Sequence, residues 1–373
     1  GDIMYRYNKK NRELAKRYSK VKLAIGIFNG IFVPLIFLVF LLISGLNTNI
    51  VNIVSRFGIL SIPVYAFIFM TLLVTVQFPV RFYSSFAYEH KYKLSAHTLR
   101  SWFVDYFKSL LLGFMFFIAL FSGLFAIIGL SYWWIYATIA YLFLVLAMSY
   151  IFPIIILPFF YKIEPYKNAE HKKSLLSMTK SMGLNEIKNV VIIKESEKSK
   201  KPNAVFMGIG KTKTIGLFDT LIHNFPKPEI ESVIWHELGH YVGRDNIRHV
   251  IIDTIKMMFI LFVVDNVFRA YSIPLTVMSF PLIMLSFLLL ELLTMPITNT
   301  YTRYLEKHAD LFSLRLTKNI SAHVSTEMRL ADMHLSEERV HPLIEFFFYT
   351  HPTTAKRIAY AREYWKKGKK KMN

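Results

Sequence analysis

The feature that most constrains this chain is a long stretch without charge, from Ser109 to Tyr161, which contains no Asp, Glu, Lys or Arg. Its length suits two membrane spans of about 20 residues each, joined by a tight turn near Gly129. With 54% hydrophobic residues and a mean hydropathy of +0.36, the chain also carries more apolar surface than one soluble core needs to bury. A lipid bilayer is therefore the expected environment.

Four further stretches are also long and apolar enough to cross a bilayer. They are residues 23–46, 59–80, 251–268 and 270–290. The third is interrupted by Asp253, Lys256 and Asp265, whereas the other three have no charge. The sequence thus predicts a mainly α-helical membrane protein with about six transmembrane helices.

The net charge of +20 is distributed on one side of the predicted membrane. Residues 1–22, 80–107, 161–246 and 299–373 hold 40 of the 45 Lys and Arg residues. This asymmetry is typical of positive-inside topology, so we expect both termini in the cytoplasm. The charge then orients the protein and contacts membrane lipids, and its distribution argues against nucleic acid as a partner.

The predicted spans divide the chain into alternating membrane and cytoplasmic segments. We expect residues 1–160 to form four spans, with a cytoplasmic loop at 80–107, and residues 247–298 to form two more. Between and after these spans, residues 161–246 and 299–373 are expected to form two cytoplasmic catalytic segments. Patterning within 161–246 predicts a helix at 168–182, a strand at 190–194, a hairpin formed by 205–210 and 214–218, and a helix at 229–239. The cytoplasmic part is therefore expected to have an α+β fold. The chain has no cysteine, so thiolate metal sites and cysteine nucleophiles are excluded.

The last predicted helix carries the sequence His236-Glu237-Leu238-Gly239-His240, which is a HExxH motif. Two histidines four residues apart lie on one face of a helix and can bind one zinc ion. Glu237 lies beside that face, where a carboxylate can accept a proton from water that a metal has acidified. A chance match on an ordinary helix is the alternative, and a second acidic motif downstream argues against it.

Catalytic zinc usually has three protein ligands, so the motif needs a partner elsewhere in the chain. We expect Glu306, just beyond the last span, with Asp310 one helical turn later accepting the free ring N–H of a ligand histidine. Glu291 is the alternative candidate for the third ligand, although its position within the last span suits a polar group facing an internal cavity. His308 points away from Glu306 on a helix and is expected at the surface.

These residues and their surroundings resemble the type I CAAX prenyl protease family, seven-span zinc proteases that cleave prenylated proteins near the carboxyl terminus. The resemblance covers nearly the whole chain. Its landmarks are residues 17–20, 82–90, 101–108, 202–208, 217–221, 236–240, 299–310 and 351–357.

The resemblance implies roles for individual residues. His236, His240 and Glu306 match the zinc ligands, Glu237 the general base and Asp310 an acid behind the ligands. It also implies that Arg357 orients Glu306, that His351 faces the developing oxyanion, and that Asn203 and Ala204 belong to the edge strand that binds the substrate. Read from the residues alone, His351 could equally begin a helix and Asn203 could lie in a turn.

The family fold implies spans that enclose a water-filled chamber with the zinc site at its cytoplasmic end. Ionisable residues within the predicted spans fit such an interior, because charges facing lipid are costly; they are Asp253, Lys256 and Glu291. The family's eukaryotic members have an additional span before the segment matching residues 17–20, and in this sequence that span is either absent or removed.

The sequence thus predicts a zinc metalloendopeptidase that cleaves peptides or proteins that are prenylated or membrane-associated. It would lie in the plasma membrane of a bacterium or in the endoplasmic reticulum of a eukaryote. A heat-shock type of membrane quality-control metalloprotease is the first alternative, but such proteins have two spans before HExxH rather than four. A scaffold or transporter with an inherited zinc site is the second alternative, and the intact Glu237 argues against it.

Overall fold

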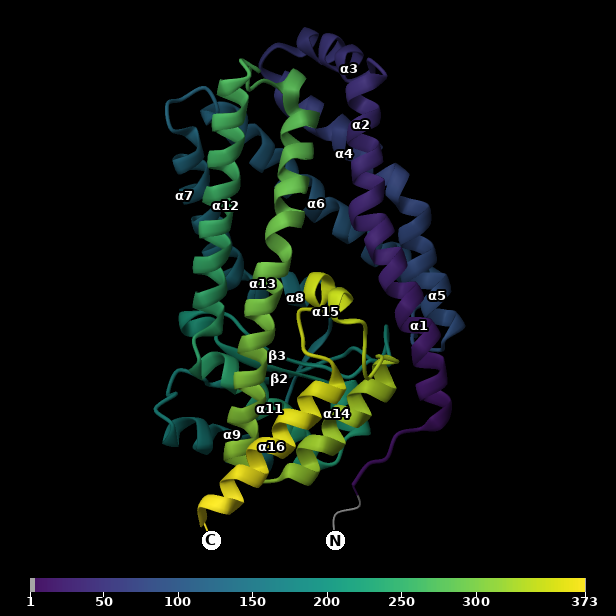
Figure 1. Ribbon diagram of the computed structural model, residues 1–373, viewed down its shortest axis with the longest axis vertical. Helices are drawn as coiled ribbons and strands as arrows, with labels where there is room; N and C mark the ends of the chain where they lie inside the picture. Colours follow the sequence, from purple (N-terminus) through teal and green to yellow (C-terminus); the bar gives the residue numbers. More distant parts are fainter. Residues whose placement is uncertain (1–3, 373) are drawn as a thin grey trace.

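The computed structural model describes residues 4–372 and is built mainly from helices, with one small sheet. Long helices occupy the upper part of the molecule in Figure 1, and the sheet and shorter helices lie below them. The beginning of α1 and the end of α16 lie at the same lower end. This arrangement separates an apolar helical part from a part rich in polar side chains.

Within residues 4–372, five helical segments are long and apolar enough to cross a membrane: Lys9–Ile43, Leu46–Lys91, Leu99–Ile127, Trp133–Phe160 and Val277–Thr317. Their α-helices are α1 (Lys9–Ile27), α2 (Val33–Ile43), α3 (Leu46–Val54), α4 (Ser61–Phe82), α5 (Tyr88–Lys91), α6 (Leu99–Ile127), α7 (Trp133–Ile151), α8 (Leu157–Phe160) and α13 (Phe280–Thr317). Single π or 3₁₀ turns join α1 to α2, α3 to α4, α4 to α5 and α7 to α8.

The predicted span at 251–268 corresponds to α12 (Asp245–Ala270), which runs beside α7 and α13. It is not among the five segments of the described residues that are apolar enough to cross a membrane. Its charged side chains have partners within the protein. Asp265 accepts a hydrogen bond from the Trp133 indole at 2.8 Å, and Lys256 pairs with Glu291 on α13 at 2.7 Å. These pairs reduce the cost of charge at membrane depth.

The prediction for 270–290 was wrong at its beginning. Residues 271–276 form a turn and an irregular segment, and α13 begins only at Phe280, with Pro281 in its first turn. Proline favours this position because its missing N–H needs no partner there. From Phe280, α13 continues through 38 residues to Thr317. One continuous helix therefore connects the membrane part to the metal centre.

An aromatic cluster holds the upper helices together. Tyr65 is 1% exposed and contacts Phe69, Phe121 and Phe280, with ring centroids 5.5–6.2 Å apart. Its hydroxyl donates a hydrogen bond to the Asn47 side chain at 2.6 Å. The tyrosine thus buries a large apolar ring while its polar end remains satisfied.

The sheet has four strands in the order β1-β2-β4-β3. Their bounds are β1 Ile163–Pro165, β2 Asn189–Ile193, β3 Ala204–Met207 and β4 Thr214–Phe218. β2 and β4 are parallel, while β1–β2 and β3–β4 are antiparallel, so the predicted hairpin is present. β3 lies at one edge, which leaves one row of its backbone groups without a partner strand.

Helices pack against this sheet around a core that includes Leu217, Leu221, Ile234, Trp235 and Leu238. The helices around this core are α9 (Ala169–Ser181), α10 (Asp219–Asn224), α11 (Lys227–Val242) and α14 (Ile320–His334). α15 (Pro342–Phe348) and α16 (Thr354–Met372) pack against α13 instead. α11 and α13 pack closely together, and α14 packs against α11. This packing brings residues from widely separated parts of the sequence to one site.

Candidate metal centre

The centre is built on α11, whose beginning is fixed by local sequence. Pro226 precedes the helix, Pro228 lies in its first turn and Glu229 places a negative charge near its amino end. The helix continues to Val242. His236 and His240 are consequently one turn apart on one face, with their ring centroids 4.8 Å apart.

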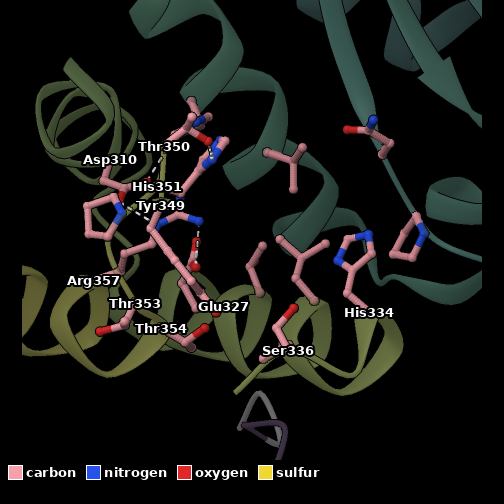
Figure 2. A pocket seen from close by; sticks show the side chains of 18 of the residues that line it. Asp310, Glu327, His334, Ser336, Tyr349, Thr350, His351, Thr353, Thr354 and Arg357 are labelled. Carbon is pink, nitrogen blue, oxygen red and sulfur yellow. Dashed lines mark hydrogen bonds and ion pairs between the residues drawn. The ribbon is translucent and has the colours of Figure 1, made fainter. Parts of the chain in front are cut away.

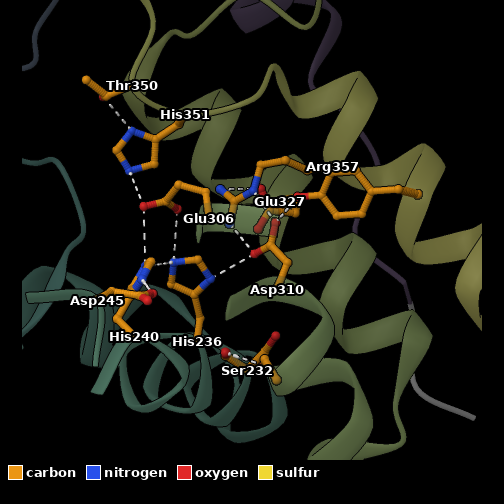
Figure 3. Close-up of polar contacts among 12 residues, drawn as sticks. Ser232, His236, His240, Asp245, Glu306, Asp310, Glu327, Thr350, His351 and Arg357 are labelled. Atoms are coloured by element: carbon orange, nitrogen blue, oxygen red, sulfur yellow. Dashed lines mark hydrogen bonds and ion pairs between the residues drawn. The ribbon is translucent and has the colours of Figure 1, made fainter. Parts of the chain in front are cut away.

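α13 brings Glu306 to these two histidines (Figure 3). The ring Nε2 atoms of His236 and His240 lie 3.2 Å apart, and each lies 3.3 Å from an oxygen of Glu306. A tetrahedral zinc ion with bonds of about 2.0–2.1 Å keeps its ligand atoms roughly 3.3–3.4 Å apart. Glu306 Oε2 is also buried, and it has no hydrogen-bond partner among the described residues. The three donors therefore fit a tetrahedral metal ion.

Two carboxylates fix the orientation of the histidine rings. Asp310 Oδ1 lies 2.8 Å from His236 Nδ1, and Asp245 Oδ2 lies 2.8 Å from His240 Nδ1. When each Nδ1–H donates to its carboxylate, both Nε2 lone pairs point toward Glu306 and repel one another unless a cation lies between them. Although burial opposes a charged ring, Asp245 and Glu306 raise the pKa of His240 to about 9. The pocket thus favours positive charge at its centre.

Gly239 allows α11 and α13 to approach closely enough for Glu306 to reach the histidines. A Cβ atom at this position would lie only 3.0 Å from Ala309 Cα and 3.2 Å from its carbonyl oxygen. These are backbone atoms, so a larger residue must push the two helices apart.

We therefore expect Gly239→Val to weaken metal binding at least tenfold, which is the effect of losing a residue that orients a metal ligand. The substitution should also lower the thermal unfolding temperature, because it overpacks the contact between the two helices. Gly123→Val on α6 is the control, because a Cβ there would meet no atom within 4 Å. Metal titration and thermal unfolding of both variants measure the effect. Full metal affinity in Gly239→Val would contradict this role.

The placement of Arg357 corrects the role expected from the sequence. Its guanidinium pairs with Asp310 at 2.5 and 2.8 Å and with Glu327 at 2.9 Å, rather than with Glu306 (Figure 3). Arg357 lies in the first turn of α16, which packs against α13 one helical turn beyond Glu306. It therefore orients His236 through Asp310.

Asp310, His323 and Glu327 form a second buried group with the composition of a metal site. Here the Arg357 guanidinium already supplies the positive charge that the two carboxylates require. Burial raises the pKa of Glu327 to about 7 and lowers that of His323 to about 4, so His323 remains neutral. This group supports the first centre and needs no second metal.

Removing Arg357 is expected to weaken metal binding by about 10–100-fold, the range for residues that orient metal ligands. Arg357→Lys should restore only part of the loss, because an ammonium group cannot form two parallel hydrogen bonds to Asp310. Arg362→Ala, at an exposed position on the same helix, is the matched control. Competition with a chelator measures the metal affinity of each variant. Equal affinities for Arg357→Ala and the control would show that Arg357 does not support metal binding through Asp310.

Glu237 and His351 lie on the open side of the three donors. Both line a cavity of about 230 Å³ together with His236, His240 and Glu306. The His351 Nε2 atom lies 3.4 Å from Glu306 Oε1, and its side chain is 59% exposed. Burial raises the pKa of Glu237, against the opposing effect of the neighbouring histidines. Both residues can therefore reach a substrate at the centre.

The two alternatives weighed for this region lie away from the three donors. Glu291 is bonded to Lys256, as described above. His308 is exposed, and its ring packs against Tyr304 at a centroid distance of 4.4 Å.

A larger cavity of about 630 Å³ adjoins the centre beside the edge strand (Figure 2). Asn203 and Ala204 line it at the beginning of β3, and His236 and Glu237 line it from α11. Asn203 is exposed, whereas Ala204 is buried. An extended peptide beside β3 would therefore pass next to Glu237.

Sequence reasoning missed four residues around the centre: Asp245, His323, Glu327 and Tyr360. Asp245 had a usable signal, since it is an acidic residue at the start of the next helix, five positions after His240. Tyr360 donates a hydrogen bond to Asp310, and Glu327 pairs with Arg357. Only the packing of α14 and α16 places these two residues beside α13.

Comparisons with known proteins agree with this architecture. Residues 165–365 match peptidase family M48, and residues 3–162 match the CAAX prenyl protease N-terminal domain, described as five membrane helices. The chain is 27% identical to CAAX prenyl protease 1 of Saccharomyces cerevisiae, over 92% of this chain and 84% of that protein. It is 28% identical to the uncharacterized metalloprotease YhfN of Bacillus subtilis, over 94% of this chain and 85% of that protein.

The crystal structure of S. mikatae Ste24p has the same fold, with a TM-score of 0.84 at 22% identity over 95% of this chain and 89% of that one. The resemblance seen in the sequence is thereby confirmed. The chain belongs to peptidase family M48, as a multi-pass membrane metalloprotease that resembles the CAAX prenyl proteases along most of its length.

Proposed function

We propose that this protein is a zinc-dependent endopeptidase that cleaves prenylated or otherwise membrane-associated polypeptides at the cytoplasmic face of its membrane. The observation that carries the proposal is the convergence of His236, His240 and Glu306 at tetrahedral ligand spacing beside Glu237. The donor set of two imidazoles and one carboxylate suits catalytic zinc. When bound, zinc supplies a Lewis acid that acidifies water and polarises the scissile carbonyl.

The chain's own residues supply the proton transfers and the positioning. Glu237 accepts a proton from the attacking water and later donates it to the leaving amine. His351, on the open side of the site, donates a hydrogen bond to the oxygen that becomes negative in the transition state. The oriented imidazoles of His236 and His240 keep their Nε2 atoms available through the N–H bonds to Asp310 and Asp245.

Substrate binding is assigned to the free edge of β3. An extended peptide can add to this edge by backbone hydrogen bonding, with Asn203 and Ala204 beside the scissile bond. The 40 Lys and Arg residues on one side of the spans support a cytoplasmic location for the active site and for both termini. The names of the relatives that resemble this chain, CAAX prenyl protease 1 among them, support prenylated substrates.

The purified protein is expected to contain about one zinc per chain and to cleave a prenylated peptide in detergent or bilayer. Removing the metal with a chelator should abolish cleavage, and stoichiometric zinc should restore it. Elemental analysis and a fluorogenic peptide assay measure the two properties. Full activity in metal-free protein would refute the proposed function.

A further inference from the structure

Three cavities follow the edge strand in chain order. Residues 202–204 line the cavity of about 630 Å³, Phe206 lines the cavity of about 230 Å³ at the metal centre, and residues 207–209 line a third of about 500 Å³. A chain extended beside β3 therefore passes from the first cavity to the third across the metal centre. Each side of the scissile bond meets a different environment.

The first cavity is lined largely by polar side chains. Its two cationic side chains already have partners, since Lys22 pairs with Glu89 and Arg357 with Asp310 and Glu327. Figure 2 shows several of the hydroxyl and carboxylate groups that share this cavity. These polar groups can form hydrogen bonds with the part of a peptide that carries no lipid.

The third cavity, here called the apolar groove, lies between α7, α12 and residues 207–209. Leu144 and Met148 line it from α7, Phe152 lines it from the π-helical turn that follows α7, and Val250 lines it from α12. α7 belongs to a segment that can cross a membrane, and α12 lies beside it (Figure 1). The groove thus lies along a helix that is able to cross a membrane, and its apolar lining suits a hydrocarbon chain.

The apolar groove is continuous with the catalytic cleft. Asn246 and His249, on the first turns of α12, line both the cavity at the metal centre and the groove. A hydrocarbon chain attached to a residue next to the scissile bond can therefore enter the groove without leaving the cleft. A membrane phospholipid has no covalent link that holds it at this place.

We propose that the apolar groove binds the isoprenoid chain of a prenylated substrate, while the peptide's carboxyl-terminal residues extend toward residues 202–204. The inference rests on the proposed function and adds the location and orientation of the lipid. Burial of the isoprenoid against α7 and α12 then contributes to the selection of lipidated over unlipidated peptides. The segment carrying the isoprenoid lies on the amino side of the cleaved bond.

The test compares one peptide with and without a farnesyl thioether on the same cysteine. Met148→Trp and Val250→Trp fill the groove, and Phe143→Trp is the control because Phe143 is 69% exposed on α7 and does not line it. We expect the first two to lower kcat/KM for the farnesylated peptide by about tenfold or more and to leave the unlipidated peptide within about twofold. Equal losses for both peptides, or no loss for either, would overturn the proposal.

A photoreactive isoprenoid on an uncleavable peptide gives an independent readout. It should label α7 or residues 207–209, and the unlabelled farnesylated peptide should compete. Competition by phospholipid alone would assign the groove to a bilayer lipid and overturn the inference.

The same experiments separate failure of this inference from failure of the proposed function. Wild-type protein that cleaves neither peptide would refute the proposed function. Photolabelling would still test whether the groove binds the isoprenoid. Cleavage of both peptides with equal kcat/KM would leave the protease assignment intact and refute the groove.

Discussion

Glu237→Gln is expected to lower kcat for peptide cleavage by about 10²–10⁴-fold, the range for loss of a general acid–base. Glutamine preserves the shape of the side chain but cannot accept a proton from water. Glu237 is not one of the three converging donors, so metal content should be unchanged. Elemental analysis alongside steady-state kinetics tests both halves of this expectation.

Two outcomes would contradict the assignment of Glu237. Retention of more than a few per cent of activity would mean that another group accepts the proton. Loss of the metal together with activity would mean that the carboxylate holds the ion rather than the water. Glu231→Gln on the same helix is the matched control, because its carboxylate lies toward His171 and Lys227, away from the three donors.

Glu306→Ala is expected to lose the metal at concentrations that saturate the wild type, and with it all activity. The substitution removes one of three ligands and leaves His236 and His240 as a pair, which is fewer than a catalytic zinc site normally has. The vacancy also lies in a buried position, 6% exposed in the present protein. Metal titration and the peptide assay measure the result.

Glu291→Ala is the matched control for Glu306→Ala, because it removes a carboxylate from the same helix. Glu291 pairs with Lys256, so its removal should leave metal binding intact. Loss of metal in Glu291→Ala and retention in Glu306→Ala would transfer the third ligand into the membrane part. Loss in both would indicate that α13 no longer holds its position against α11.

The HExxH helix could be predicted from sequence because its signals are local. Proline at the amino end, a first-turn carboxylate and the four-residue spacing of His236 and His240 all act within α11. Glu306 also followed from its acidic motif just after a span. The beginning of α13 was missed because residues 271–276 are uncharged and apolar enough to resemble part of a span.

Arg357 shows where sequence reasoning reached its limit. Its proximity to the centre was expected, but its partner was not, because Glu306 and Asp310 are separated by only one turn of α13. Which of the two carboxylates the guanidinium reaches depends on where α16 crosses α13. The position of that crossing cannot be predicted from a local sequence pattern. The same holds for Glu327, which reaches Arg357 from α14.

The sequence by itself determined the membrane character, the sidedness of charge and the nature of the metal donors, because hydropathy, charge and spacing act over short stretches of chain. Tertiary structure alone decided how the donors meet. The close approach of α11 and α13 at Gly239 sets the distance from Glu306 to the histidines. The order of the cavities along β3 likewise depends on contacts between distant segments, since packing, unlike hydropathy, is a property of the whole fold.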